Sequence, residues 1–283
     1  MQQITDIDAC RNAVQRVGRT DQRVGLVPTM GALHEGHLSL MREARRRCGF
    51  VAVTIFVNPT QFAAGEDLER YPRPLQADLA ACEKTGVDLV FTPTAGAMFP
   101  GDATTTVRVT ELTTGLCGAH RPGHFDGVTP VVAKLFQILP CDVAFFGEKD
   151  YQQLVVVRRM VRDLNMPIDI VGCPIVREED GLALSSRNAY LSPEDRAQAV
   201  SLSRALFAAQ EQVAAGECSA RALVGRIRER IEAAGPVQID YIEVVDPESL
   251  EPVREVLGDA RICLAARIGP CRLIDNIAVR HAR

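Results

Sequence analysis

The sequence predicts an α/β protein with a Rossmann-like, doubly wound parallel sheet, followed by a smaller α+β domain. Over residues 1–175, short apolar runs alternate with amphipathic stretches. Strand–helix alternation of this kind forms βαβ units around a parallel sheet. After Pro174 the pattern changes to two consecutive helical stretches and then three strand-like runs without long helices between them. We therefore expect one domain over residues 1–176 and a second over residues 177–283.

The expected elements follow from the periodicity of apolar residues. The run FVAVTIFV at 50–57, for example, is apolar and β-branched, which is typical of a strand buried on both faces. The first domain is expected to contain strands at 24–27, 50–57, 88–91, 143–146 and 168–171, and helices at 37–47, 75–84, 128–139 and 150–164. The second is expected to contain helices at 193–215 and 219–234, and strands at 238–245, 261–266 and 272–277. Because ligands in doubly wound sheets bind outside the carboxyl ends of the strands, a functional loop should directly follow a strand.

Composition argues against several classes of partner. The formal net charge is −4 and no basic block dominates, so we do not expect nucleic acid as a partner. There is no apolar run of about 18 residues, so we expect no membrane span. Nine cysteines occur without any CxxC pair, and the amino terminus lacks the apolar core of a signal peptide. Together these features predict a cytoplasmic protein.

The segment LVPTMGALHEGH, at 26–37, follows the first predicted strand and opens a helix. Gly31 and Gly36 allow a close approach of the backbone to a ligand. The free N–H groups at the start of the helix favour an anion. His34 and His37 are three residues apart, so both rings project from about the same side and can donate to phosphate oxygens.

Two other interpretations of these histidines compete with phosphate binding. A zinc site is disfavoured because zincins use HExxH, whereas this segment has HEGH. The nearest further candidates, His120 and His124, show no ligand spacing. A purely structural role for both rings is the second alternative, and phosphate binding is favoured over both.

Three other segments carry polar groups after predicted strands or at the domain boundary. Asn58 and Gln61, in NPTQF, offer amide groups suited to a hydroxy acid and an amine, although alone they also suit a plain turn. In GEKD at 147–150, Lys149 can neutralise phosphate, although a Lys–Asp pair also suits surface capping. In SSR at 185–187, the guanidinium of Arg187 can bind phosphate with two hydrogen bonds, although the tripeptide alone also suits helix capping.

In this order, PTMGALHEGHLSL, VNPTQF, FGEKDYQQ and SSR closely resemble the pantoate–β-alanine ligase family, over nearly the whole chain. The resemblance implies ATP-dependent condensation of pantoate with β-alanine through pantoyl adenylate, Mg²⁺ as cofactor, and a homodimer. It implies His34, His37, Lys149 and Arg187 as catalytic residues. It assigns to ATP binding Met30, Gly31, His34, Gly36, His37, Gly147, Lys149, Asp150, Val176, Leu184, Ser185, Ser186 and Arg187. It assigns Gln61 and Gln153 to pantoate and β-alanine, to which we add Asn58. We also expect the second domain to carry the SSR loop and to close over the site.

For two segments the sequence does not define a role: one concerns the protein ligands of Mg²⁺, and the other is the motif at 121–127. After Tyr71-Pro72-Arg73 the family often has consecutive aspartates implicated in Mg²⁺ binding, whereas this chain retains only Asp78. No metal ligand is therefore assigned, and Mg²⁺ is expected to be held mainly by the ATP phosphates and water. The motif RPGHFDG at 121–127 also matches the family, and ordering of a loop or contact with β-alanine explains it equally well.

Two rival functions share part of this pattern. A nucleotidyltransferase that moves AMP onto a phosphate would explain HxGH and the sheet, but not VNPTQF or the paired glutamines at 152 and 153. A nucleotide-sensing module without catalysis would need the ATP loops but no second substrate.

Overall fold

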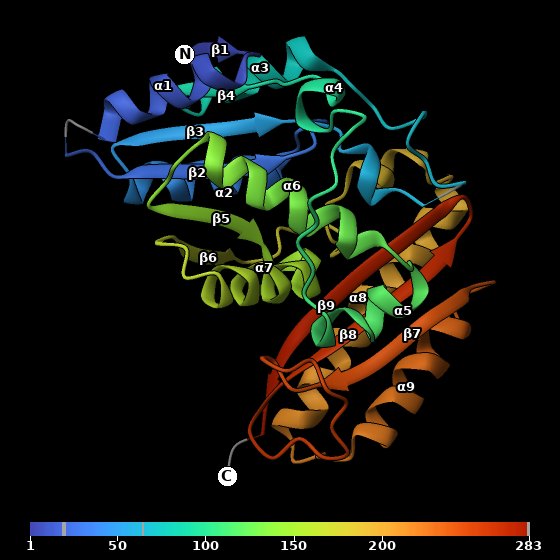
Figure 1. The fold of residues 1–283 in the computed structure, drawn as a ribbon. Coiled ribbons are helices and arrows are strands. Elements are labelled where there is room, and N and C mark those ends of the chain that lie inside the picture. Colours follow the sequence, from blue (N-terminus) through green and yellow to red (C-terminus); the bar gives the residue numbers. More distant parts are fainter. Residues whose placement is uncertain (19–20, 64, 282–283) are drawn as a thin grey trace. The chain divides into compact units, whose positions relative to one another are not determined.

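The structure, a computed structural model, describes residues 1–18, 21–63 and 65–281 (Figure 1). The chain forms two compact units. The first comprises Met1–Glu111, Arg121–Glu148 and Gln153–Pro174. The second comprises Leu112–His120, Lys149–Gln152 and Ile175–Arg283. The second unit thus includes two short segments that precede residue 177 in the chain.

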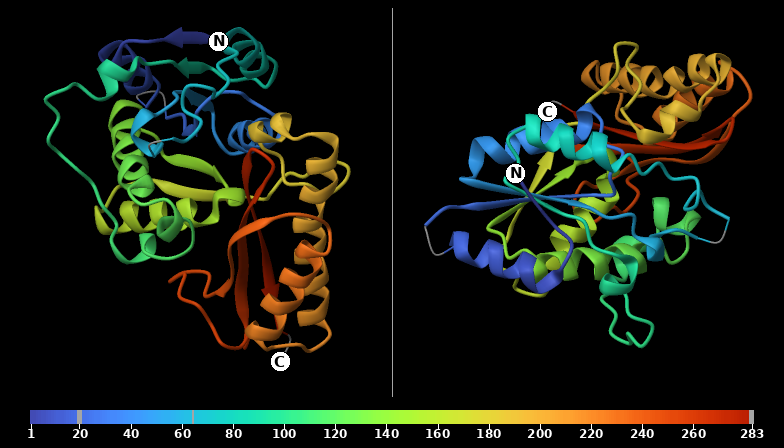
Figure 2. Two further views of the ribbon diagram at one scale, coloured as in Figure 1. Left: turned by 90° about the vertical axis from the view of Figure 1, so that its right-hand side faces the viewer. Right: turned by 90° about the horizontal axis from the view of Figure 1, so that it is seen from above.

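The first unit is built on a six-stranded sheet. Its strands are β1 (Gln2–Ile4), β2 (Val24–Thr29), β3 (Phe50–Ile55), β4 (Leu89–Phe91), β5 (Val143–Gly147) and β6 (Asp169–Cys173). They lie in the order β1-β4-β3-β2-β5-β6, and every recorded pairing is parallel. In the right-hand view of Figure 2 the strands fan out from one another, as twisted sheets do. The predicted doubly wound parallel sheet is confirmed.

Helices cover both faces of this sheet. They are α1 (Ile7–Gly18), α2 (Glu35–Arg47), α3 (Leu75–Lys84), the short α4 (Ala95–Met98), α6 (His124–Ile138) and α7 (Tyr151–Asp163), with 3-10 turns η1 (Pro59–Gln61) and η3 (Glu148–Asp150). Helices α2 and α3 lie on one face and α1, α6 and α7 on the other (Figure 1). Because both faces are covered, the central strands are mostly apolar; Val53 and Phe145 are completely buried.

The strand order places a topological switch point beside β2. From β2 the chain proceeds through β3 to β4 on one side, whereas β5 and β6 lie on the other side. Strands β2 and β5 are neighbours, with Leu26 paired with Ala144. The segments that follow β2, β3 and β5 therefore all begin at the same edge of the sheet, where doubly wound folds bind ligands.

The second unit combines an antiparallel sheet with two long helices. Strands β7 (Gln238–Val245), β8 (Asp259–Ile268) and β9 (Cys271–Arg280) are paired in that order. Helices α8 (Pro193–Ala214) and α9 (Ala220–Glu232) pack against the sheet, as Figure 2 shows. The unit also contains α5 (Leu116–His120), η2 (Glu111–Thr113, which begins at the last residue of a first-unit segment) and η4 (Ser186–Tyr190). This confirms the predicted α+β architecture.

The structure differs from the prediction at several elements. Helix α6 begins at His124 rather than at 128, because Gly123 provides a left-handed residue (φ +81°) immediately before it. Helices α1, α4 and α5 and the three-residue strand β1 were not predicted.

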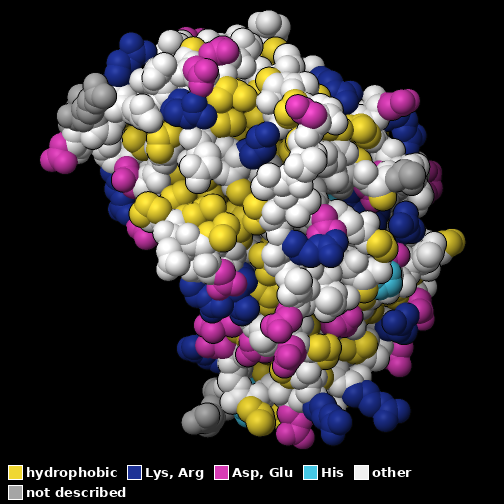
Figure 3. Space-filling model, in the orientation of Figure 1, with side chains coloured by type: hydrophobic (Ala, Val, Ile, Leu, Met, Phe, Trp, Pro, Cys, Tyr) yellow, Lys and Arg dark blue, Asp and Glu magenta, His cyan; other side chains and the backbone are white. Residues whose placement is uncertain are grey.

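The surface carries charges of both signs. On the face shown in Figure 3, basic and acidic side chains are interspersed. Several arginines pair with acidic neighbours, among them Arg45 with Asp88 and Arg23 with Asp169. Within the described part of the chain, none of the helices has the length and apolar character needed to cross a membrane.

Candidate active site

The turn that follows β2 contains two successive left-handed residues. Gly31 has φ +79° and Ala32 has φ +51°. For a residue with a side chain, this conformation costs about 1–2 kcal/mol. The turn is held by Asp78 from α3, whose two carboxylate oxygens accept hydrogen bonds from the backbone nitrogens of Ala32 (2.9 Å) and Leu33 (2.8 Å). Asp78 is 2% exposed, so it acts as an internal support for the turn.

Asp78 also explains why position 31 is glycine. A Cβ on Gly31 would lie 2.9 Å from Oδ2 of Asp78 and 2.9 Å from Cγ2 of Ile55. The close approach and the positive φ both require glycine here.

The carboxylate of Asp78 is not available as a ligand for Mg²⁺. Both oxygens of Asp78 are used by backbone amides, and the residue is buried. Over residues 1–18, 21–63 and 65–281, no group of three or more His, Cys, Asp or Glu side chains is placed to hold a metal ion. Asp78 is therefore a positioning residue, a role that no motif in the sequence indicated.

The two histidines lie at the start of α2 with their rings in contact, centroids 4.1 Å apart and planes inclined by 40°. Nδ1 of His34 accepts a hydrogen bond from the backbone nitrogen of Gly36 (3.2 Å). Nδ1 of His37 accepts one from the backbone nitrogen of His34 (3.3 Å). A ring nitrogen that accepts a hydrogen bond carries no proton, so in both neutral rings the proton is on Nε2. The backbone thereby fixes the tautomer of both rings and makes each Nε2–H a donor.

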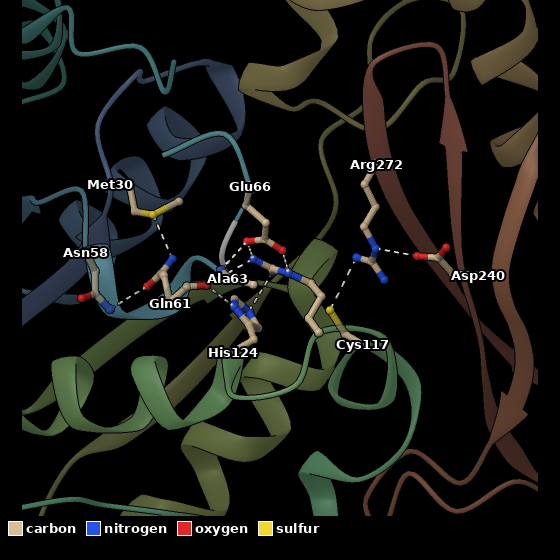
Figure 4. Close-up of polar contacts among 10 residues, drawn as sticks. Met30, Asn58, Gln61, Ala63, Glu66, Cys117, His124, Asp240 and Arg272 are labelled. Carbon is tan, nitrogen blue, oxygen red and sulfur yellow. Dashed lines mark hydrogen bonds and ion pairs between the residues drawn. The ribbon is translucent and has the colours of Figure 1, made fainter. Parts of the chain in front are cut away.

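The segment after β3 is organised around a buried amide. Asn58 is 1% exposed and caps η1, since its Oδ1 accepts from the backbone nitrogen of Thr60 (3.2 Å). Its Nδ2 donates to Oε1 of Gln61 and to the carbonyl oxygen of Gly127, both at 3.0 Å. Nε2 of Gln61 in turn lies 2.9 Å from Sδ of Met30 (Figure 4). The segments after β2 and β3 are therefore in direct contact.

The segment after β5 begins with open space above its backbone. A Cβ added to Gly147 would meet no atom within 4 Å. Gln153, on α7, is half-buried. Its neighbour Gln152 is buried and has a structural role. Its Oε1 accepts a hydrogen bond from the backbone nitrogen of Cys117 (2.9 Å), and its Nε2 donates to the carbonyl oxygen of Leu112 (2.9 Å). Gln152 thus links the start of α7 to the segment Leu112–His120 within the second unit.

In the second unit, Lys149 is fixed through its main chain. Its carbonyl oxygen accepts from Nδ2 of Asn276 (3.0 Å), and Oδ1 of Asn276 accepts from Nε of Arg261 (2.8 Å). The ammonium of Lys149 lies 3.9 Å from Oδ2 of Asp150. Asn276 is a supporting residue on β9 that no motif in the sequence indicated.

The second unit also brings together four of the predicted ATP-binding positions. The backbone nitrogen of Leu184 donates to the carbonyl oxygen of Val176 (3.0 Å). Oγ of Ser185 accepts from the backbone nitrogen of Arg187 (3.3 Å) and so caps η4. The carbonyl oxygen of Arg187 accepts from Sγ of Cys271 on β9 (3.3 Å).

The predicted residues thus fall into two sets. In the first unit, the segments that carry them begin at one edge of the sheet. These residues are Met30, Gly31, His34, Gly36, His37, Asn58, Gln61, Gly147 and Gln153. The second unit holds Lys149, Asp150, Val176, Leu184, Ser185, Ser186 and Arg187.

The fold and the turn after β2 define a class, namely doubly wound α/β proteins with a helix amino terminus at the switch point. The family model described as pantoate-beta-alanine ligase matches residues 2–278. The chain belongs to this family, and it is therefore a ligase that forms a carbon–nitrogen bond. The resemblance inferred from the motifs is confirmed.

Individual relatives agree along the full length. The pantothenate synthetase of Heliobacterium modesticaldum is 53% identical over 279 residues, which is 99% of this chain and 98% of the relative. The crystal structure of pantothenate synthetase from Thermus thermophilus is similar with a TM-score of 0.93 and 48% identity, covering 98% of this chain and 99% of that one. The pantoate-beta-alanine ligase of Francisella tularensis, complexed with β-γ ATP and β-alanine, gives a TM-score of 0.81 at 33% identity, covering 98% and 97%.

Proposed function

We propose that this chain condenses (R)-pantoate with β-alanine at the expense of ATP, through pantoyl adenylate, to give pantothenate, AMP and pyrophosphate. Membership of the family supports the substrates. The observation that carries the mechanism is the pair of Nε2–H donors of His34 and His37, set by backbone hydrogen bonds to both Nδ1 atoms. The Francisella tularensis relative, complexed with β-γ ATP and β-alanine, supports two of the three substrates.

In the first half-reaction a pantoate carboxylate oxygen attacks the α-phosphorus of ATP, and the bond to the bridging oxygen of pyrophosphate breaks. The protein supplies position and charge rather than covalent chemistry. His34 and His37 donate to the phosphate oxygens on which negative charge increases. Lys149 and Arg187 neutralise the leaving pyrophosphate. Mg²⁺ enters as part of the Mg–ATP substrate, bound mainly by phosphate oxygens and water.

The remaining ATP contacts are assigned to backbone and small residues. Gly31 and Gly36 lie in the turn and the first turn of α2, where N–H groups favour an anion. The open space at Gly147 suits close approach of the nucleotide to the backbone. The proposed set is completed by Met30, Asp150, Val176, Leu184, Ser185 and Ser186.

In the second half-reaction the neutral amine of β-alanine attacks the acyl carbon of the adenylate. AMP leaves with the bridging oxygen, and the nitrogen loses a proton as the amide forms. Gln61 and Gln153 are proposed to position pantoate and β-alanine through their amide groups. The buried Asn58 is engaged by Gln61 and by the backbone, which supports a role in orienting Gln61 within this part of the site.

The test is coupled product release. Enzyme is mixed with Mg–ATP and D-pantoate while pyrophosphate is followed, and β-alanine is then added while AMP is followed. Pyrophosphate in about enzyme-equivalent amount, then sustained AMP and amide only after the amine, is the expected result. Sustained pyrophosphate release without an amine would indicate a nucleotidyltransferase, and ATP binding without pyrophosphate would indicate a sensing module.

We further propose that the chain acts as a homodimer in the cytoplasm. The dimer is an expectation from the family, and sedimentation equilibrium over a range of concentrations tests it. The nine cysteines are all free, which suits a reducing compartment. Fractionation of cells that produce the protein tests the location.

A further inference from the structure

The motif RPGHFDG, for which the proposed reaction assigns no role, contacts the segment that carries Gln61. Arg121 forms two hydrogen bonds with the Glu66 carboxylate, from Nε to Oε1 (2.7 Å) and from Nη2 to Oε2 (2.6 Å). Nη2 also donates to the carbonyl oxygen of Gln61 (3.2 Å). Nδ1 of His124 lies 2.8 Å from the same carbonyl oxygen, and its Nε2 lies 3.1 Å from Nη1 of Arg121 (Figure 4).

These contacts fix the tautomer of His124. A guanidinium can only donate, so Nε2 of His124 must accept from Arg121. Nδ1 therefore carries the proton and donates to the carbonyl oxygen of Gln61, which has no hydrogen to give. The main chain of Gln61 is thus held by two donors, and Glu66 orients one of them.

At the other end of the motif, Gly127 packs closely against the backbone of the same segment. A Cβ on Gly127 would lie 2.2 Å from the carbonyl oxygen of Thr60 and 2.6 Å from the backbone nitrogen of Gln61. The backbone of α6 therefore touches the backbone of η1 directly. The carbonyl oxygen of Gly127 also accepts from Nδ2 of Asn58 (3.0 Å), which at the same time bonds to the side chain of Gln61.

Partial burial strengthens the hydrogen bonds between Arg121 and Glu66. The side chains of Arg121 and Glu66 are 16% and 25% exposed, so the ion pair is partly removed from water. Because two parallel hydrogen bonds join the planar guanidinium of Arg121 to the carboxylate of Glu66, the relative orientation of these two groups is also fixed. Both ends of the motif thus restrict the position of one glutamine.

We infer that Arg121, His124 and Gly127, with Glu66, are positioning residues that set the placement of Gln61 and thereby the binding of pantoate and β-alanine, and not of ATP. The inference rests on the proposed role of Gln61. It also answers the question that the sequence left open, because the polar atoms of Arg121 and His124 described above are directed at protein groups of the Gln61 segment. The motif orders a loop rather than contacting β-alanine.

The first experiment compares variants at His124. His124→Leu removes both ring contacts, whereas His124→Asn retains a donor near the place of Nδ1. His124→Leu should raise the KM values for pantoate and β-alanine about tenfold, the effect of one hydrogen bond, with the KM for ATP changed less than twofold. His124→Asn should recover much of this loss. Asp126→Asn, an exposed position of the same motif paired with Arg108, serves as the control and should behave as the parent enzyme.

The second experiment does not depend on the substrates. Hydrogen–deuterium exchange of the peptide covering residues 58–63 is compared between the parent, His124→Leu and Glu66→Gln, the last of which keeps the shape of the side chain. Both variants should exchange faster in this peptide, while peptides from β7–β9 remain unchanged.

The possible outcomes distinguish failure of this inference from failure of the proposed function. Unchanged KM values and unchanged exchange in both variants overturn the inference. A rise confined to the KM for β-alanine, with exchange unaltered, overturns it in favour of direct contact with that substrate. If the parent enzyme forms no pyrophosphate from pantoate, the proposed function fails, and the exchange experiment still decides whether the motif orders Gln61.

Discussion

The carboxylate of Asp78, on α3, accepts a hydrogen bond from the backbone nitrogen of Leu33 at 2.8 Å, across 45 residues of chain. Its other oxygen accepts from the backbone nitrogen of Ala32 at 2.9 Å. One side chain thus satisfies two donors of the turn that leads to His34 and His37, in a place from which water is excluded. The orientation of the two rings depends on a residue outside the motif that contains them.

Replacing Asp78 by Asn should weaken both the fold and the reaction. The amide retains one acceptor oxygen, but its NH₂ group faces a backbone N–H that is then left without a partner. We expect a loss of about 1–3 kcal/mol in the free energy of unfolding, measured by denaturant titration. Pyrophosphate release with pantoate should fall as well. Glu83→Gln, an exposed carboxylate on the same helix, is the control, and equal stability of the two variants would contradict the assignment.

His37 is expected to act as a donor to the transition state. His37→Ala should reduce adenylate formation by about 10²–10³-fold, the scale of one preorganised donor. His37→Gln retains an N–H near the position of Nε2 and should lose less. The measurement is single-turnover pyrophosphate release with saturating pantoate and ATP. A rate for His37→Ala within a few-fold of the parent would exclude this role.

Gly127 and Gly225 should respond to alanine with opposite signs. At 127 the new methyl would overlap the carbonyl oxygen of Thr60, so α6 and η1 must separate, at a cost of about 1–3 kcal/mol. At 225, inside α9, the methyl meets no atom within 4 Å, and alanine should stabilise the helix by up to about 1 kcal/mol. Thermal unfolding of the two variants measures both effects. A Gly127→Ala variant as stable as the parent would show that this contact can relax freely.

Glu66 should contribute stability that is lost in acid. Partial burial acts to raise the pKa of Glu66, but the hydrogen bonds and charge of Arg121 outweigh it and leave the pKa below its ordinary value. A carboxyl whose pKa is lowered by folding stabilises the protein above its unfolded pKa, and this contribution disappears as the pH falls through the folded pKa. The stability difference between the parent and Glu66→Gln should therefore be constant above about pH 5 and narrow below about pH 4.

The control for this pH series is Asp126→Asn. The hydrogen bonds from Arg108 lower the pKa of Asp126 too, but solvent screens this exposed pair. Its stability difference from the parent should be smaller at every pH. Parallel curves for the parent and Glu66→Gln down to pH 3 would contradict the prediction for Glu66.

Thiol reagents should distinguish Cys218 from the other cysteines. Of the nine, all of which lie in the described part of the chain, Cys218 alone is not buried. Burial raises the pKa of Cys10, Cys82, Cys141 and Cys263 to about 12, which keeps these thiols protonated and slow to react. Native protein should show one fast-reacting thiol, and Cys218→Ser should abolish the fast phase. Several fast thiols in the parent would indicate opening of the core.

The sequence was sufficient to predict where the site segments begin. A buried strand, a glycine turn and a helix start in succession placed the His34 and His37 segment at the carboxyl end of β2. The same argument placed Asn58 and Gln61 after β3 and Gly147 at the end of β5. In each case local periodicity defines the strand, and the rules of parallel sheets then define the edge.

The supporting residues could not be predicted, because their partners are distant in sequence and are mostly backbone atoms. Asp78 binds two amides of another segment, and Asn276 binds the carbonyl of Lys149 from 127 residues away. A pattern of side chains carries no signal of such contacts. The function of the RPGHFDG motif was ambiguous for the same reason, since its hydrogen bonds end on the main chain of Gln61. Strand β1 was missed because three residues are too few for periodicity to appear.

The position of β2 between β3 and β5 has a consequence for biosynthesis. The segments after β2 and β3 leave the ribosome early, and these two strands can pair while the chain is still short. Strand β5, at Val143–Gly147, pairs with β2 only after the intervening hundred-odd residues have been made. Contacts of such separation form late because a long loop must close first. In a nascent chain that stops before Val143, the side of β2 that pairs with β5 has no partner strand. The carboxyl ends of the strands, which carry the substrate segments, are therefore brought together only near the end of synthesis of the first unit.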